Sequence, residues 1–391
     1  PKVNKRILAL DILRGFTIAG MILVNNPGSW GHIYAPLRHA EWNGLTPTDL
    51  VFPFFMFIMG ISTYISLKKY NFEFSQSAAL KIVKRTIVIF LVGCAIGWFS
   101  RFCRYWVTAP EDLSFFENLW ASVWTFDRMR ILGVMQRLAL CYGAASIVAL
   151  TVKHKRIPYI IATILIGYFV ILMCGNGYEY NETNILSIVD RAILTPTHMY
   201  KDNGIDPEGL LSTLPSIAHV LLGFYVGKLM LDGNKSQDRM SFLNSQIVTL
   251  FLVGTILTFA GFLLSYGCPI NKKIWSPTFV LTTCGLASSF LALLIWIIDV
   301  KGKKKWSLFF EAFGVNPLFM YVLGGVLSIL FGCIRFPWGD GMISIHTFLY
   351  KIVLMPIFGE TGGSLAFALL FVTINWCIGY QLYKRKIYIK I

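Results

Sequence analysis

Apolar residues recur along the whole chain in stretches long enough to cross a bilayer, and short basic or polar segments separate them. A membrane-spanning helix needs about 20 mostly apolar residues. Because lipid offers the backbone no hydrogen-bonding partner, such stretches predict helices rather than open strands. We therefore predict an all-α, polytopic bundle of about ten transmembrane helices, near Ile7–Val24, Pro47–Leu67, Ile82–Ser100, Ile131–Thr151, Ile157–Cys174, Leu210–Met230, Ile247–Tyr266, Thr278–Ile298, Leu308–Phe331 and Ser364–Tyr383.

A further stretch, Gly341–Phe358, is apolar but contains His346, Lys351 and Pro356. We predict an interfacial or re-entrant helix here, because an eleventh span would place the basic C-terminus on the outer side. The chain has no internal repeat and no low-complexity tract, so residues 1–391 are predicted to form a single transmembrane domain.

The distribution of Lys and Arg predicts which side of the membrane each loop faces. With the N-terminus inside, the inner segments carry about twice as many Lys and Arg as the outer segments, as the positive-inside rule requires. Both termini are therefore predicted to be cytoplasmic. The long polar segments 25–46, 101–130 and 175–209 then face outward, and long loops on a rigid scaffold often carry function.

Composition supports the membrane interpretation and excludes two other classes. Only 14% of the residues are charged, whereas a soluble domain carries about 25%. The net charge of +15 does not indicate a nucleic-acid-binding protein, because the basic residues form short clusters between apolar runs. They are suited instead to anionic lipid or a phosphorylated cofactor. The eight cysteines form no CxxC, and no histidines have metal-ligand spacing, so we expect no metal.

Candidate chemistry first appears in the stretch RHAEWNGLTPTDLVFPFF, where His39 and Asp49 stand at the mouth of the second span. Asn25 closes the first span, so the connection to the second span returns all three residues to one membrane level. A carboxylate can fix the tautomer and orientation of an imidazole that acts as a base or nucleophile. The alternatives are a solvated His39 and a helix-capping Asp49.

Polar residues within or beside the spans also need an explanation, because a charge at a helix centre is costly in lipid. Asp11 and Arg14 share one helix face and form either an internal ion pair or part of an anion site. Arg137 must pair or face a polar cavity. Asn316 precedes Pro317 inside the ninth span, and a proline there predicts a kink.

Asp206 and Glu208 precede the sixth span. Carboxylates at a helix N-terminus are favoured by the helix dipole, so both residues are candidate caps. Glu208 is alternatively a ligand for a cationic or hydroxylated substrate.

Seven segments then resemble one known family, that of heparan-α-glucosaminide N-acetyltransferase and its bacterial relatives. The resemblance covers nearly the whole chain and is carried by LALDILRGFTIAGMILVNNPG, RHAEWNGLTPTDLVFPFFMFIMGIS, RILGVMQRLAL, GIDPEGLLSTLPSI, GFYVGKLML, NKKIWSPTFVLTT and FGVNPLFMY. As in the bacterial relatives, we expect neither the lysosomal N-terminal domain nor the extra leading span. The resemblance implies a multi-pass protein of the bacterial inner membrane.

The resemblance also implies a reaction. The family moves an acetyl group from cytoplasmic acetyl-CoA to the amine of a glucosamine-type sugar on the other side of the membrane. Its active-site histidine matches His39, and the neighbouring Asn and Asp match Asn25 and Asp49. His39 would act as general base or transient acetyl carrier, Asp49 would orient it, and Asn25 would stabilise the oxyanion. The lysosomal enzyme has a further His in the ninth span that this sequence lacks near Tyr321.

Binding roles follow from the same resemblance. Residues expected to bind acetyl-CoA are Arg14, Arg137, Lys228, Asn316 and the cluster Lys301–Lys305. Residues expected to bind the acceptor are Glu208, Asp206, Trp42 and Asn43. The predicted partners are an amino sugar and the lipid bilayer, with no nucleic acid, and a homodimer is left open.

Two other functions remain open at this point. A secondary transporter would also place charges and a broken helix inside the membrane, although paired broken helices and inverted repeats are not visible in the sequence. A membrane O-acyltransferase of surface glycans would share the donor and differ in the acceptor.

Overall fold

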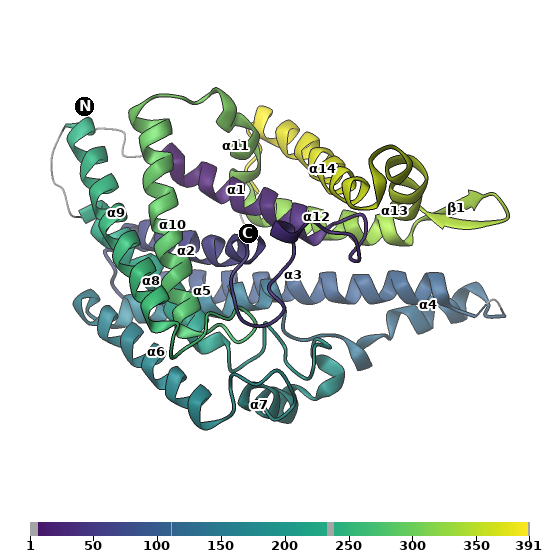
Figure 1. Cartoon of the computed structure of the whole chain (residues 1–391), viewed down its shortest axis with the longest axis horizontal. Helices are drawn as coiled ribbons and strands as arrows, with labels where there is room; N and C mark the ends of the chain where they lie inside the picture. The colour runs from purple at the N-terminus through teal and green to yellow at the C-terminus, as the bar shows by residue number, and fades with distance from the viewer. Residues whose placement is uncertain (1–6, 111, 233–237, 390–391) are drawn as a thin grey trace.

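The computed structural model describes residues 7–110, 112–232 and 238–389, which fold into a bundle of long helices with one small hairpin (Figure 1). The helices in the first half of the chain are α1 (Leu8–Asn25), α2 (Pro47–Leu67), α3 (Gln76–Thr108), α4 (Phe115–Val123), α5 (Val134–Thr151), α6 (Ile157–Cys174) and α7 (Ile185–Leu194). Those in the second half are α8 (Thr213–Asp232), α9 (Arg239–Leu264), α10 (Pro277–Leu294), α11 (Leu308–Gly314), α12 (Pro317–Cys333), α13 (Ile345–Thr347) and α14 (Met355–Lys384).

The predicted fold class, an all-α polytopic bundle, is confirmed. Among the described residues, eight helices are long and apolar enough to cross a membrane, or nine if a bent pair counts as one span. The bent pair is α11 and α12, which meet at 77° at the predicted Asn316–Pro317 kink. The predicted span Ile82–Ser100 lies within α3, which is not among the eight. The molecule is thus an all-α polytopic membrane protein, and its described residues contain eight or nine helices that meet this criterion of length and apolarity, where about ten spans were predicted.

The segment after α12 contains structure that the hydrophobic pattern did not predict. Strand β1 (Arg335–Trp338) pairs antiparallel with β2 (Gly341–Ser344). Gly339 has a φ of 58°, a conformation that favours glycine in a tight hairpin turn. The helix predicted over Gly341–Phe358 therefore starts only at Ile345, and Gly359, with a φ of 74°, separates it from the last span.

Glycines allow the helices at the centre of the bundle to approach closely. A Cβ on Gly15 would lie 1.7 Å from the carbonyl oxygen of Phe310, so α1 rests directly on α11. A Cβ on Gly60 would lie 2.3 Å from the backbone oxygen of Val220, so α2 rests on α8. Small residues permit such contacts in membrane bundles, where van der Waals packing drives association. Helices α1 and α2 are therefore each packed closely against another helix of the bundle.

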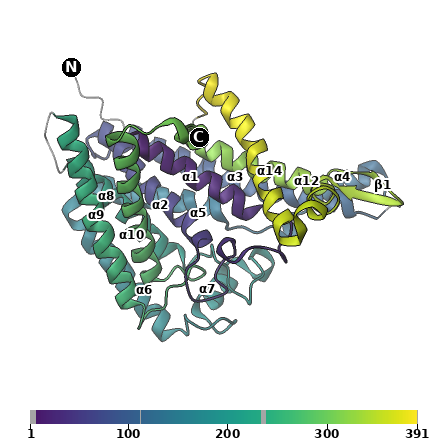
Figure 2. The same cartoon turned by 45° about the horizontal axis from the view of Figure 1, so that its top comes forward.

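Three connecting segments meet at the end of the bundle where α1 ends and α2 begins. Gly44 N–H donates to the Ile270 carbonyl at 2.8 Å, and the Trp42 indole donates to the Tyr178 carbonyl at 2.8 Å. In both views these loops gather beside α7, away from the hairpin and α4 (Figures 1 and 2). Residues from 26–46, 175–212 and 265–276 thus share one surface.

Candidate active site

The gathered loops enclose a polar cavity of about 460 Å³, which we call the His39 cavity. It opens between the α1–α2 connection, the segment before α8 and the α9–α10 connection. Its lining contains four acidic and four basic side chains, besides a histidine and two aromatic rings. The lining residues are Asn25, Trp30, His39, Ala40, Glu41, Asp49, Arg130, Tyr200, Lys201, Asp202, Pro207, Glu208, Lys272 and Lys273.

His39 and Asp49 are in direct contact in this cavity. The distance from His39 Nδ1 to Asp49 Oδ1 is 2.6 Å. The Asp49 side chain is 1% exposed, whereas that of His39 is 40% exposed. Because an ionised carboxylate only accepts hydrogen bonds, Nδ1 carries the proton and donates it to Asp49. The lone pair of Nε2 remains available, which is the arrangement that a general base requires.

Asp49 also caps α2, so the two roles weighed for it from the sequence are compatible. Its Oδ2 accepts from Thr46 N at 3.1 Å, Thr46 Oγ1 at 3.0 Å and Ala40 N at 3.1 Å. Thr46 and Asp49 thereby form a capping box, and Pro47 occupies the first helical position. One carboxylate oxygen holds the backbone and the other holds His39.

Lys272 is a third member of this cluster that the sequence analysis did not select. Its Nζ lies 3.1 Å from His39 Nδ1 and 3.5 Å from Asp49 Oδ1, and its side chain is 18% exposed. Burial lowers the pKa of Lys272, and the carboxylates of Asp49 and Glu208 partly oppose that shift. Lys272 belongs to the NKKIWSP motif, but 233 positions separate it from His39, so only the fold reveals the contact.

Opposite this cluster, Arg130 binds both carboxylates of the segment before α8. Its Nη2 donates to Asp206 Oδ1 and, at 2.5 Å, to Glu208 Oε2. Burial opposes charge on these groups, but the pairing outweighs it and raises the pKa of Arg130 while lowering that of Glu208. Glu208 lines the cavity, whereas Asp206 is fully buried and also accepts from Tyr200 N. Arg130, too, was absent from the sequence analysis.

Lys273, the next lysine on the same loop, is paired with other residues. Lys273 Nζ lies 2.8 Å from Asp202 Oδ2 and donates to the Tyr180 hydroxyl at 2.6 Å. The Tyr180 ring stacks on Trp42, with 4.6 Å between ring centroids. Trp42 is therefore linked to the cavity through Tyr180 and Lys273, and neither aromatic ring is among the lining residues.

The two predicted asparagines of this region lie apart. Asn25 ends α1 and lines the His39 cavity. Asn43 is exposed, and its Oδ1 accepts from Asn271 Nδ2 at 3.2 Å, which links the α1–α2 and α9–α10 connections.

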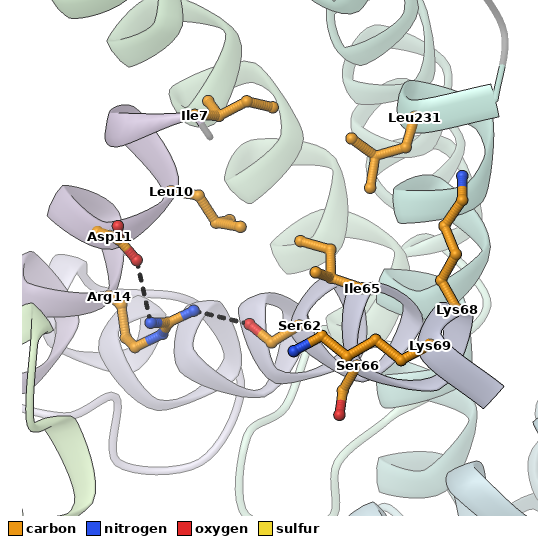
Figure 3. A pocket seen from close by; sticks show the side chains of 10 residues that line it. All are labelled: Ile7, Leu10, Asp11, Arg14, Ser62, Ile65, Ser66, Lys68, Lys69 and Leu231. Atoms are coloured by element: carbon orange, nitrogen blue, oxygen red, sulfur yellow. Dashed lines mark hydrogen bonds and ion pairs between the residues drawn. The ribbon is translucent and has the colours of Figure 1, made fainter. Parts of the chain in front are cut away.

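A larger cavity, of about 610 Å³, opens near the opposite ends of α1 and α2 and is called here the Arg14 cavity (Figure 3). Arg14 Nη1 pairs with Asp11 Oδ1 at 3.2 Å, and Nη2 donates to Ser62 Oγ at 2.8 Å. The lining contains three basic side chains and one acidic side chain. The lining residues are Ile7, Leu10, Asp11, Arg14, Ser62, Ile65, Ser66, Lys68, Lys69 and Leu231.

The other residues expected to bind acetyl-CoA lie outside both cavities. Lys228 lines a separate recess with His154, and Arg137 is buried, donating to the Gly209 carbonyl at 3.0 Å. Asn316 is also buried, and its side chain bonds to the backbone of residues 387 and 389 at 2.8 Å each. The fold therefore brings Arg14 to a cavity and gives Arg137 and Asn316 contacts within the protein.

Metal-ligating side chains do not cluster in the described ranges, 7–110, 112–232 and 238–389. Within them, no group of three or more His, Cys, Asp or Glu side chains is placed to hold a metal ion.

Comparison with known proteins identifies the family. The sequence profile described as "Heparan-alpha-glucosaminide N-acetyltransferase, catalytic" matches residues 6–261, about two thirds of the chain. The chain belongs to this family. The matched range includes His39, Asp49, Arg14 and Glu208 and ends before Lys272.

Two curated relatives give the same assignment. The human protein named heparan-alpha-glucosaminide N-acetyltransferase is 27% identical over 374 residues, covering 81% of this chain and 52% of the relative. The mouse protein of the same name is 26% identical over 450 residues, covering 99% of this chain and 60% of the relative. This chain thus spans between half and two thirds of the length of these members of the heparan-alpha-glucosaminide N-acetyltransferase family.

Proposed function

We propose that this protein is a transmembrane acetyltransferase that moves an acetyl group from acetyl-CoA to the amine of a glucosamine-type sugar. The observation that carries the proposal is the His39–Asp49 contact of 2.6 Å in a cavity that opens to the surface. Membership of an acetyltransferase family supports the reaction type. The identity of the donor and the acceptor is part of the proposal.

Charge supports the assignment of the two substrates to the two cavities. Four acidic and four basic side chains line the His39 cavity, so its formal charge is balanced and suits a sugar amine. The Arg14 cavity has three basic side chains against one acidic side chain and suits a ligand that carries phosphates. Arg14, Lys68 and Lys69 would hold the anionic part of the donor. We place this end of the bundle, together with both termini, in the cytoplasm, because the loops predicted to face inward are rich in Lys and Arg.

The chain's own groups supply the proton chemistry. In the direct route, Nε2 of His39 takes the proton that the acceptor amine loses as its nitrogen attacks the acetyl carbonyl. The new C–N bond forms, the C–S bond breaks, and the proton passes from His39 to the departing thiolate. In the two-step route, Nε2 itself carries the acetyl group before the amine attacks. Asp49 orients the ring in both routes.

Several cavity residues are assigned to binding in the same scheme. Asn25 lies at the edge of the cavity, where its side-chain amide is suited to donate to the oxyanion. Glu208 is held by Arg130 and accepts a hydrogen bond from the acceptor. Trp30 is exposed and offers an apolar face to a sugar ring.

Substitution of His39 tests the function. Purified protein in detergent is incubated with acetyl-CoA and glucosamine, and both CoA release and N-acetylglucosamine are measured. We expect His39→Ala to lower the rate by about 100-fold or more, because a general base contributes about that much. The matched control is His32→Ala, which lies on the same connection and contacts Glu360 rather than Asp49.

Two outcomes would contradict the proposal. Full activity in His39→Ala would move the chemistry to another residue. Failure of the wild-type protein to bind acetyl-CoA and to acetylate any amine would favour a transport function.

A further inference from the structure

We propose that Lys272 is a positioning residue that sets how readily His39 accepts and releases a proton. The inference deepens the proposed function and rests on it, because it assumes that His39 is the base of the transfer. It assigns a role to a side chain that lies beyond the family match.

One ring nitrogen of His39 has two charged neighbours. Asp49 Oδ1 lies 2.6 Å and Lys272 Nζ 3.1 Å from His39 Nδ1. A protonated Nδ1 can donate to the carboxylate but cannot accept from an ammonium. The opposite tautomer would place a bare Nδ1 against a carboxylate at 2.6 Å, which is repulsive. Lys272 is therefore a positive charge at the edge of the ring and a partner of Asp49, rather than a donor to His39.

The backbone that carries Lys272 is firmly held. Asn271 is fully buried, its N–H donates to Ser276 Oγ at 3.0 Å, and its Oδ1 accepts from Ile274 N at 3.2 Å. The side chain of Asn271 also reaches Asn43 on the α1–α2 connection. Because Lys273 is paired with Asp202, it cannot replace Lys272 at this position.

The expected consequence is electrostatic. Asp49 favours a protonated imidazole ring, and the ammonium of Lys272 disfavours it. Without Lys272, the ring would hold its proton more tightly and return it more slowly to a departing thiolate. Most of the other charged groups around the cavity form pairs of opposite charge. They surround His39 both when its ring is neutral and when it is protonated. They are Glu41, Arg130, Lys201, Asp202, Glu208 and Lys273.

The experiment measures the protonation of His39 without using the transfer reaction. Diethyl pyrocarbonate carbethoxylates neutral imidazole, and mass spectrometry of the peptide containing His39 gives the extent of reaction at each pH. We expect Lys272→Met, which removes the charge and keeps the length, to move the midpoint of this profile upward by about one pH unit. Lys272→Arg keeps the charge and should leave the midpoint near that of the wild type.

Lys273→Met is the matched control, because it removes a lysine from the same loop that contacts Tyr180 and Asp202 instead of His39. Thermal unfolding verifies that each variant is folded, and Lys272→Gln replaces Lys272→Met if the latter is not. In a plot of transfer rate against pH, the rise on the acidic side should shift in the same direction as the carbethoxylation midpoint.

The outcomes separate the two proposals. An unchanged midpoint in Lys272→Met, or an equal shift in Lys272→Arg or Lys273→Met, would overturn the role of Lys272. If the midpoint shifts in Lys272→Met but His39→Ala keeps full activity, Lys272 does influence the protonation of His39. In that case His39 is not the base of the transfer. A shift in both the midpoint and the acidic rise of the transfer rate supports both proposals.

Discussion

The two cavities differ in the balance of the charges that line them. The His39 cavity is lined by equal numbers of acidic and basic groups, which form pairs such as Lys272 with Asp49 and Arg130 with Glu208. In the Arg14 cavity, Arg14 pairs with Asp11 and Lys68 pairs with Asp232 outside the lining, but basic lining groups outnumber acidic ones by three to one. A paired set of charges offers directional contacts to a small polar ligand, whereas an excess of one sign attracts any ligand of the opposite sign.

The cavities also differ in the elements that build them. Loops form the His39 cavity, and buried side chains such as Asp190, Asp206 and Asn271 fix those loops by accepting hydrogen bonds from their backbone N–H groups. Helices α1, α2 and α8 form the Arg14 cavity (Figure 3). One site is thus specified by many local hydrogen bonds and the other by the packing of helices. Substitutions should therefore have different effects at the two sites.

The largest effect is expected for Asp49→Asn. The amide lacks the negative charge that holds the imidazole. Its NH₂ group would also point at hydrogen-bond donors that Asp49 now accepts from. These donors are either His39 Nδ1 or the backbone N–H groups of Ala40 and Thr46. We expect kcat to fall by about 100-fold or more, while the KM for acetyl-CoA stays unchanged. Steady-state kinetics with each substrate varied in turn provides the measurement.

Because Asp49 also caps α2, thermal unfolding of this variant must be compared with that of Thr46→Ala, which weakens the cap and leaves the carboxylate. If Thr46→Ala loses as much activity as Asp49→Asn, the capping role alone explains the effect.

A smaller effect is expected for Arg14→Ala, and on a different parameter. Loss of one charged donor costs about 1.5–3 kcal/mol, which corresponds to a rise in the KM for acetyl-CoA of about tenfold or more. The KM for the acceptor should not change. Arg14→Lys should recover part of the binding, and Arg128→Ala, at an exposed arginine, is the control. A change in acceptor KM instead would contradict the division of substrates between the cavities.

The smallest effect is expected for Asp190→Asn and concerns stability. Asp190 accepts from Leu210 N at 2.9 Å and Leu211 N at 3.2 Å, and burial raises the pKa of its carboxyl to about 6. A carboxyl with a raised pKa binds more protons in the folded state than in the unfolded state. Its ionisation therefore lowers the free energy of unfolding as pH rises from about 4 to 6, and this loss of stability persists above pH 6. The variant should therefore melt a few degrees higher than the wild type above pH 6 and no higher below pH 4.

Tryptophan fluorescence during heating at a series of pH values gives this comparison. An equal difference between the two proteins at all pH values would show that ionisation of Asp190 is not its cause.

Sequence alone predicted the features that depend on local pattern. The spans follow from apolar runs, the bend at Asn316 follows from Pro317, and the nearness of His39 to Asp49 follows from their separation by only ten positions at the start of the second span. The hairpin before Ile345 was missed because its strands are only four residues long, although the WGDG turn signal is visible in the sequence.

Features that depend on contacts between distant segments were not predictable. Asp206 was expected to face the acceptor, but Arg130, 76 positions earlier, pairs with it in the interior. Lys272 lacked any local pattern that distinguishes it from Lys273, and only the fold directs one to His39 and the other to Asp202. The roles of Asn25, Asp206, Glu208, Trp42 and Asn43 in binding remain predictions.

The stretch of α1 between the two cavities has a consequence for energetics across the membrane. Arg14 and Asn25 are eleven positions apart, roughly 16 Å along the helix, and every residue between them is uncharged. Moving one elementary charge through the full membrane potential involves about 2.3 kcal/mol per 100 mV. An acetyl group is neutral, so its passage along this stretch does no electrical work. We therefore expect the proposed transfer to proceed at the same rate in energised and de-energised vesicles.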